Sequence, residues 1–193
     1  MVFVDGTNLK IACQEDYGIK LNIAKLKSLL IKGYHAHGFR YYTSSMPHNS
    51  RDYARLQKER AFFAEIARMH GVTLYKGVHV AYKRAIKGIQ LSSGNLIEIE
   101  HEYHVEKRTD VKLAIDMVDL AHRQKLNETY DVAMLVSNDT DFVPAVEMAR
   151  ALGKQVLWCG LDKHTATSDL ARACNGPRIL TTAELQSCAR TAS

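Results

Sequence analysis

Short apolar runs alternate with amphipathic stretches along most of the chain. The runs have the length and the polar boundaries of buried strands, and they lie at 1–5, 38–45, 72–78, 131–136 and 155–159. Between them, apolar residues recur at helical spacing, over 23–32, 51–70, 110–124 and 141–152. We expect a loop between the first strand and the helix that follows Asn22. The alternation predicts an α/β fold with a mostly parallel central sheet and helices on both faces.

The predicted helix at 110–124 has an apolar stripe that we expect to face the core. Its members recur at helical spacing and are Val111, Ala114, Ile115 and Val118. Further along, 160–193 is expected to complete the domain with short elements. Ser168 is placed to cap a helix that ends near residue 174, and a short strand follows at 179–180. Thr181 and Glu184 then have the spacing of a capping box for a last helix.

Residues 79–107 break the alternation of strands and helices. Two strand-like segments, 86–91 and 96–105, flank a Ser-Ser-Gly-Asn sequence that is typical of a turn. We therefore predict a β-hairpin inserted into the α/β fold. Its exposed edges could pair with a second copy of the chain, as unprotected strand edges tend to do.

The composition fits one compact domain that spans residues 1–193. The chain has 193 residues, of which 46% are hydrophobic, enough for a full core. No apolar stretch approaches the roughly 18–20 residues that a membrane span needs, and we expect no signal peptide because the first strand begins at once. The four cysteines have no C-x-x-C spacing and are interpreted as reduced thiols. We therefore expect a cytoplasmic protein with no membrane partner.

Carboxylates follow two of the predicted strands. Asp5 ends the first strand, and Asp139 and Asp141 follow the strand at 131–136. Ligands of open α/β sheets collect beyond the carboxyl ends of the strands, so these groups are expected to converge. Carboxylates that converge repel one another, and Mg²⁺ or Mn²⁺ is the usual counterion because both prefer oxygen ligands. The alternatives are an Asp-Gly turn at Asp5 and a helix cap at Asp141.

Four further polar residues are candidates to join or support these carboxylates. Asn8 is close enough in sequence to orient Asp5, and the Ser137 hydroxyl could hold a neighbouring carboxylate. Asp110 opens the helix at 110–124, where a negative charge also favours the helix dipole. Asp116 lies about 240° further around that helix and cannot share the face of Asp110. We expect Asp116 either to act behind the site or to pair with Lys112 on the solvent side.

The positive charge of the chain is concentrated in its middle. The net charge is +5, but residues 32–87 carry eleven Lys or Arg and three Asp or Glu. A basic segment beside an acidic pocket suits a polyanionic substrate such as RNA, although a solvated surface gives the same composition. The candidate phosphate contacts are Arg51, Arg55 and Lys58 on one helix stripe, Lys83, Arg84 and Lys87 on the hairpin, and Lys107 at its end.

Three motifs together resemble the NYN domain, a family of the PIN-like ribonuclease superfamily that includes the LabA-like proteins. The motifs are Val-Phe-Val-Asp5-Gly-Thr-Asn8, Lys107-Arg-Thr-Asp110 with Asp116, and Ser137-Asn-Asp139-Thr-Asp141-Phe142. The resemblance runs from residue 2 to about 160. It implies a Rossmannoid, PIN-like three-layer sandwich and RNA cleavage that depends on Mg²⁺ or Mn²⁺.

On this resemblance, the acidic site that binds metal and catalyses cleavage would be Asp5, Asp110, Asp139 and Asp141. Asn8, Asp116 and Ser137 would support it. The chain departs from the family pattern at Asn138 and Thr140, where many relatives are expected to have glycine. The hairpin also lies where many relatives have a shorter connection.

Other motifs fail on inspection. A haloacid-dehalogenase signature needs a nucleophilic aspartate at position 3, where this chain has Phe3, and neither a dinucleotide fingerprint nor a P-loop is present. The histidines do not have zinc-ligand spacing. We therefore predict a metal-dependent endoribonuclease. Two alternatives stay open, a non-catalytic RNA-binding or scaffolding protein and a phosphoesterase for small nucleotides.

Overall fold

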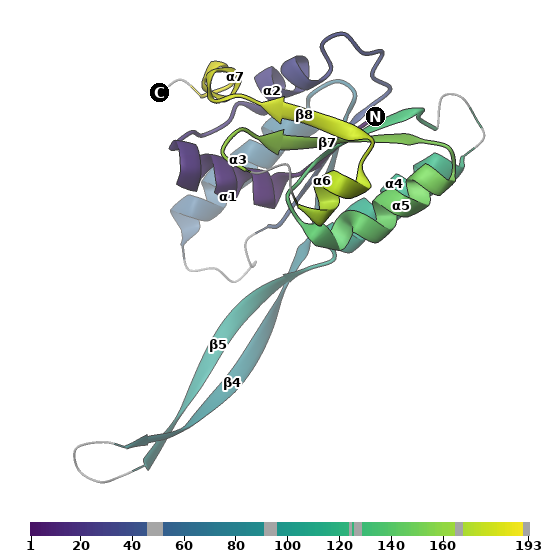
Figure 1. Ribbon diagram of the computed structural model, residues 1–193. Coiled ribbons are helices and arrows are strands. Elements are labelled where there is room, and N and C mark those ends of the chain that lie inside the picture. The colour runs from purple at the N-terminus through teal and green to yellow at the C-terminus, as the bar shows by residue number, and fades with distance from the viewer. Residues whose placement is uncertain (46–51, 91–95, 124, 126–128, 165–167, 191–193) are drawn as a thin grey trace.

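The computed structural model describes residues 1–45, 52–90, 96–123, 125, 129–164 and 168–190. Its centre is a six-stranded sheet in the order β3-β2-β1-β6-β7-β8, in which every neighbouring pair is parallel (Figure 1). The strands are β1 (Val2–Asp5), β2 (Phe39–Thr43), β3 (Val72–Lys76), β6 (Val132–Val136), β7 (Gln155–Leu161) and β8 (Gly176–Leu180). The predicted α/β class with a mostly parallel sheet is confirmed.

Helices cover both faces of the sheet. One face packs against α1 (Gly6–Tyr17), α2 (Ile23–Leu30), α3 (Tyr53–Ala67) and α7 (Thr182–Ser187). The other packs against α4 (Thr109–His122), α5 (Val143–Ala151) and α6 (Asp169–Ala173). Alternate strand residues feed the two cores, so Val2 and Val4 face the first and Phe3 faces the second.

The loop expected after the first strand is wrong, because α1 begins there directly. Asp5 caps this helix by accepting a hydrogen bond from the Asn8 backbone N–H at 3.0 Å. Gly18 ends it in a left-handed conformation at φ 65°. The helix buries a narrow stripe that includes Leu9, Ala12 and Cys13 beside many polar residues. Its apolar periodicity is therefore weak, which explains why the sequence pattern does not reveal it.

The stripe expected on α4 is half right: Ala114 and Val118 are partly buried and pack against the core, but the other two members are exposed. Val111 and Ile115 are 63% and 56% exposed, whereas Leu113 and Met117 are fully buried. The buried stripe also includes Asp116, which is 7% exposed. Because the buried stripe contains a charged residue, the exposed face of α4 has the more apolar sequence pattern. Tyr42 and Arg40 of β2 contact the buried Asp116 carboxylate and stabilise its charge.

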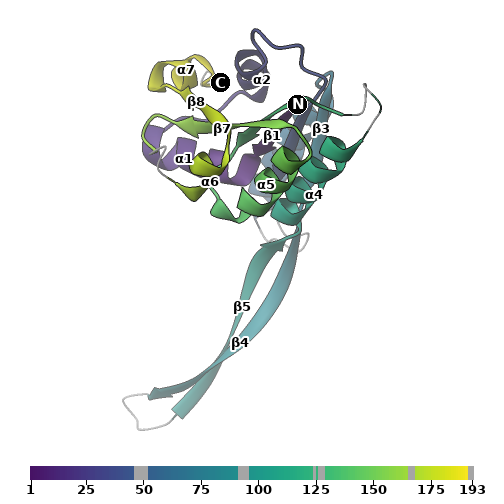
Figure 2. The same cartoon turned by 45° about the vertical axis from the view of Figure 1, so that its right-hand side comes forward.

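The hairpin expected at 79–107 is present and projects from the body in both views (Figures 1 and 2). Its strands are β4 (Val78–Gln90) and β5 (Leu96–Lys107), which pair antiparallel. The expected turn residues 92–95 lie outside the described part of the chain. Only Gly77 separates β3 from β4, and β5 leads into α4 through Arg108. The hairpin therefore starts and ends at the carboxyl edge of the sheet.

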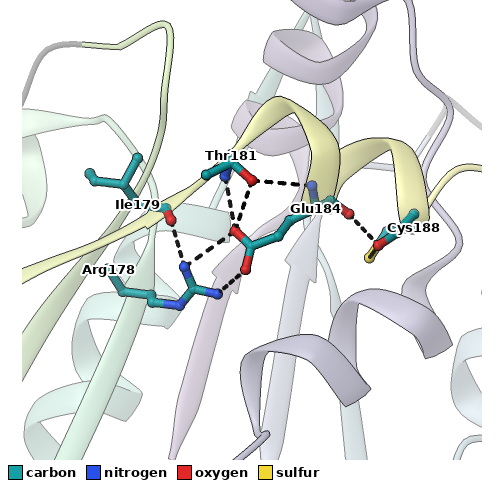
Figure 3. A network of polar contacts seen from close by, with 6 residues as sticks. Arg178, Ile179, Thr181, Glu184 and Cys188 are labelled. Atoms are coloured by element: carbon teal, nitrogen blue, oxygen red, sulfur yellow. Dashed lines mark hydrogen bonds and ion pairs between the residues drawn. The ribbon is translucent and has the colours of Figure 1, made fainter.

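Hydrogen bonds and an ion pair hold the C-terminal segment together. Thr181 and Glu184 form the predicted capping box at the start of α7, and Arg178 pairs with Glu184 at 2.6 Å (Figure 3). The helices in the described ranges are all too short or too polar to cross a membrane.

Candidate active site

The site lies where the strand order of the sheet reverses. β1 and β6 are parallel neighbours, with Val4 opposite Val136, yet their connections lead to opposite sides of the sheet. Such a switch point is where open α/β sheets bind their ligands, beyond the carboxyl ends of the strands. Asp5 ends β1 at this point, and Ser137 and Asp139 follow β6.

Gly6 is required for the sharp turn after Asp5. A Cβ atom at this position would lie 2.4 Å from ring atoms of Tyr41, a buried residue of β2 in the same core cluster as α1. Only glycine lets the backbone approach that ring so closely. The tight turn keeps Asp5 at the strand end while it caps α1.

Ser137 joins the two strand ends. Its hydroxyl donates to Asp5 Oδ2 at 3.0 Å and accepts from the Asp139 backbone N–H at 3.1 Å. Its carbonyl accepts from the Trp158 indole N–H at 2.9 Å, so β7 fixes it from behind. The expectation that this hydroxyl holds a neighbouring carboxylate agrees with these contacts.

Asp5 is buried and its charged form is disfavoured. Burial raises the pKa of Asp5 to about 6, against the lowering effect of the hydrogen bonds from Asn8 and Ser137. Repulsion from Asp110 and Asp139 raises it further. Two carboxylates from other parts of the chain are therefore close enough to Asp5 to repel its negative charge.

The other carboxylates form part of the same electrostatic cluster. Desolvation raises the pKa of Asp110, and Asp139 and Asp141 raise it further. Asp139, not Asp141, is the cap of the short 3-10 helix at Thr140–Phe142, because Asp139 Oδ1 accepts from the Asp141 backbone N–H at 2.9 Å. The sequence alternative that Asp141 is a cap is therefore wrong, and its carboxylate is exposed beside the cluster.

The cluster offers oxygen donors for a hard cation without forming a ready-made cage. Within the described ranges, no three His, Cys, Asp or Glu side chains already lie at metal-binding spacing. The donor set nevertheless fits Mg²⁺ or Mn²⁺, since every candidate ligand is a carboxylate and a cation would relieve their mutual repulsion. The residues that could hold such an ion are Asp5, Asp110, Asp139 and Asp141.

Asp116 lies in a polar group of its own. It accepts a hydrogen bond from the Tyr42 hydroxyl at 2.8 Å and pairs with Arg40 at 3.3 Å and with Lys112. Lys112 is thus its partner, as one of the two sequence alternatives stated, but Asp116 itself is buried and only Lys112 is partly exposed to solvent. Sequence reasoning missed Arg40 and Tyr42, although their alternation on one strand was a usable signal.

A second network holds the residue before Asp139. The Asn138 side chain bonds to His164 Nδ1 at 2.8 Å, and His164 Nε2 bonds to Asp16 at 2.9 Å. The Asn138 backbone N–H also donates to Asn8 Oδ1 at 3.4 Å. Sequence reasoning missed His164 and Asp16, because nothing in their spacing links them. The asparagine that departs from the family pattern at position 138 therefore has a positioning contact in this chain.

The predicted phosphate contacts are spread over two elements. Arg55 and Lys58 are exposed on α3, and Lys107 is exposed at the end of β5. Arg51 lies outside the described residues. Lys83, Arg84 and Lys87 are on β4, where Lys83 is in register with Glu102 of β5.

Comparisons with known proteins agree with this architecture. The family model of the NYN domain matches residues 1–180. A crystal structure of a protein of unknown function, VPA0982 from Vibrio parahaemolyticus RIMD 2210633, is similar with a TM-score of 0.58 and 17% identity, over 93% of this chain and 90% of that chain. At that identity, the likeness concerns the fold alone. None of the curated proteins matches. The family match spans the sheet and the carboxylates at its switch point, and this chain belongs to the NYN domain family, a nuclease-like branch of the PIN-like proteins.

Proposed function

We propose that the protein is a metal-dependent endoribonuclease that hydrolyses RNA phosphodiester bonds. The observation that carries the proposal is the coupling of Asp5 to Ser137 and Asp139 at the switch point, with Asp110 close enough to raise the pKa of Asp5. NYN domains are nuclease-like, which supports a hydrolase. The resemblance to the LabA-like proteins, which rests on the three sequence motifs, is part of the same proposal.

The four carboxylates share one task in this proposal, and the polar residues around them hold them in place. Asp5, Asp110, Asp139 and Asp141 would hold one or two Mg²⁺ or Mn²⁺ ions. When bound, such an ion supplies an activated water and neutralises charge on the phosphate. Ser137 holds Asp5 and the Asp139 backbone in place through its hydroxyl. Asn8 and the pair of Asn138 and His164 fix the loop after β6.

RNA would approach along the basic residues at the carboxyl edge. Arg55 and Lys58 are exposed on α3 and, with Arg51, could contact successive phosphates. Lys107 lies only three residues before Asp110, so it is well placed to contact RNA near the scissile bond. Lys83, Arg84 and Lys87 on β4 are further candidates, and of these Lys83 is in register with a glutamate, Glu102 of β5.

Cleavage assays with a panel of substrates test the proposal. Labelled single-stranded RNA, duplex RNA, single-stranded DNA and a small phosphodiester are incubated with Mg²⁺, Mn²⁺ or EDTA. We expect internal cleavage of RNA that stops with EDTA. RNA binding without cleavage would favour the non-catalytic alternative. Turnover of the small phosphodiester alone would favour the nucleotide phosphoesterase.

A further inference from the structure

The β4–β5 hairpin is far longer than a connection between β3 and α4 requires. Its strands have 13 and 12 residues, and it extends from the body as a two-stranded arm in both views (Figures 1 and 2). An isolated two-stranded hairpin is only marginally stable in water. Such an arm therefore gains stability from a ligand that covers one of its faces.

One face of the arm combines aromatic, aliphatic and cationic residues. Residues that are in register on two antiparallel strands lie on the same face, and successive residues along a strand alternate between the faces. The register pairs of this face, named here the tyrosine face, are Val78 with Lys107, Val80 with Val105, Tyr82 with Tyr103, Arg84 with His101 and Ile86 with Ile99. These positions include the permanent positive charges of Lys107 and Arg84 and no carboxylate.

The opposite face of the arm is acidic. The glutamates of β5 alternate with the residues of the tyrosine face, so all four share the opposite face, and they are Glu98, Glu100, Glu102 and Glu106. Lys83 lies there too, in register with Glu102. Lys87 falls in the irregular stretch between Ile86 and Ile89, so the register assigns it to neither face. A polyanion is therefore attracted to the tyrosine face and repelled by the acidic one.

The tyrosine pair suits nucleic-acid bases. The Tyr82 and Tyr103 rings stack on each other with centroids 5.7 Å apart, and the two residues are 40% and 41% exposed. The Lys107 ammonium lies 6.0 Å from the centre of the Tyr82 ring. Proteins bind single-stranded nucleic acid with aromatic rings beside cations, because bases stack on the rings while the cations contact phosphates. A base can extend this stack because both tyrosines keep exposed surface.

The tyrosine face begins close in sequence to the candidate active site. Lys107 ends β5 and is three residues before Asp110, which is in the first turn of α4. Two more exposed cations flank the base of the arm, Lys76 at the end of β3 and Arg108 between β5 and α4. Positive charge therefore continues from the arm to the carboxyl edge of the sheet, where the carboxylates gather.

We propose that the tyrosine face binds single-stranded RNA on one side of the cleavage site. Bases stack on Tyr82 and Tyr103, and Arg84 and Lys107 contact phosphates. The inference deepens the proposed nuclease function and rests on it for the identity of the ligand. It also separates two neighbouring basic residues of β4, because Arg84 is a contact whereas Lys83, on the acidic face, is not.

Protein ligands fit the tyrosine face less well. A second copy of the chain would bring Arg84 and Lys107 of both copies together with no carboxylate to pair with them, and like charges across an interface oppose association. An apolar protein segment would cover both cations without pairing them, which is unfavourable for the same groups. The phosphates of RNA supply the missing negative charge.

Binding of a labelled single-stranded RNA of about 12 nucleotides, within the range of single-strand binding sites, tests the charged contacts. Affinity is measured in EDTA at several salt concentrations, so that the RNA survives. Arg84→Gln and Lys83→Gln remove the same charge from neighbouring positions on opposite faces. We expect Arg84→Gln to reduce the slope of log K against log salt by about 0.7 and Lys83→Gln to change it much less. Arg84→Lys, which keeps the charge, should retain the slope.

The contribution of the rings is measured separately. Tyr82→Thr with Tyr103→Thr removes both rings and keeps strand-forming residues opposite each other. We expect the affinity to fall about fivefold or more with an unchanged salt slope, because stacking is lost and no charge is removed. Binding of an RNA duplex should fall less, since its bases are already paired and stacked. Tyr34→Thr, which removes an exposed ring of the body, is the control and should bind like wild type.

A fluorescent reporter detects the stacking without removing an aromatic ring. The one native tryptophan, Trp158, is buried, so Tyr103→Trp places an exposed indole on the arm. Stacking on a base should quench this indole as RNA is added in EDTA. Arg84→Gln in the same background should shift the titration to higher RNA concentration.

Three results would overturn the proposal. They are equal changes of the salt slope in Arg84→Gln and Lys83→Gln, wild-type affinity in the double tyrosine variant, and an indole on the arm that RNA does not quench. Failure of the nuclease proposal has a different outcome. A chain that binds RNA through the tyrosine face without cutting it would contradict cleavage alone. Metal-dependent cleavage with no role for the arm residues in binding would contradict the present proposal alone.

Discussion

The hydroxyl of Ser137 donates a hydrogen bond to the carboxylate of Asp5 at 3.0 Å and thereby joins the ends of β1 and β6. The same oxygen accepts from the backbone N–H of Asp139 at 3.1 Å. One side chain therefore sets the relative position of two carboxylates that are far apart in the sequence. Its carbonyl is bonded to Trp158, so the arrangement extends into the core.

Ser137→Ala is expected to impair cleavage without unfolding the protein. It removes one of the two hydrogen bonds that lower the pKa of Asp5, so that pKa should rise by about one unit, equivalent to about 1.4 kcal/mol. The acid limb of the pH–rate profile should then move to higher pH. Ser28→Ala, which removes an exposed hydroxyl on α2, is the control. An unchanged acid limb would show that Ser137 does not tune Asp5.

The elevated pKa of Asp5 predicts a pH-dependent stability in the absence of metal. The folded state holds this proton up to about pH 6, whereas the unfolded chain releases it near 3.8, the ordinary pKa of an aspartate. The unfolded state therefore binds fewer protons between these limits, and stability falls as pH rises from about 4 to 6, by on the order of 2–3 kcal/mol. Urea unfolding in EDTA should show this fall in wild type and a much smaller one in Asp5→Asn. Parallel curves would contradict the assignment.

Asp110→Ala and Asp116→Ala are expected to fail in different ways. Asp110 belongs to the repelling cluster, so its loss should abolish cleavage and leave stability unchanged or slightly higher. Loss of Asp116 leaves the Tyr42 hydroxyl and the Arg40 and Lys112 charges without their shared partner. It should cost about 1–3 kcal/mol of stability and reduce cleavage less. Equal and complete loss of cleavage in two stably folded variants would show that both carboxylates act directly.

The predicted phosphate contacts Arg51, Arg55 and Lys58 are tested by the salt dependence of RNA binding. Each lost phosphate contact should reduce the slope of log K against log salt by about 0.7 for a single strand. Changing Arg51, Arg55 and Lys58 to Gln should therefore flatten it by roughly 2, with metal affinity unchanged. The measurement needs an inactive background, such as Asp139→Asn, so that the RNA survives. An unchanged slope would mean that the stripe is a solvated helix face.

Much of the fold is encoded in patterns that a single sequence displays. Apolar runs with sharp polar boundaries located the parallel strands, and Thr181 with Glu184 located the last helix through a capping box. The pattern failed for helices whose buried stripe is narrow or includes a polar residue. In α1 it marks too few positions, and in α4 the buried Asp116 made the exposed face look like the core face.

In the candidate site, too, some residues could be predicted from the sequence and others could not. Asp5, Asp139 and Ser137 follow strands, so strand geometry alone indicates that they converge. The support from Tyr42 and His164 depends on contacts across 74 and 26 residues, which no local spacing encodes. The electrostatic coupling of Asp110 to the cluster likewise requires the position of α4 on the sheet.

Metal-dependent cleavage of single-stranded RNA by Asp139→Asn tests the central claim most directly. The control is Asp119→Asn, which changes an exposed carboxylate of α4 that pairs with Arg123 at 2.6 Å. We expect wild type and Asp119→Asn to cleave at similar rates with Mn²⁺, and Asp139→Asn to show no cleavage. Its melting temperature in EDTA should equal or slightly exceed that of wild type, because a repulsive charge is removed. Cleavage by Asp139→Asn at the wild-type rate would contradict the account.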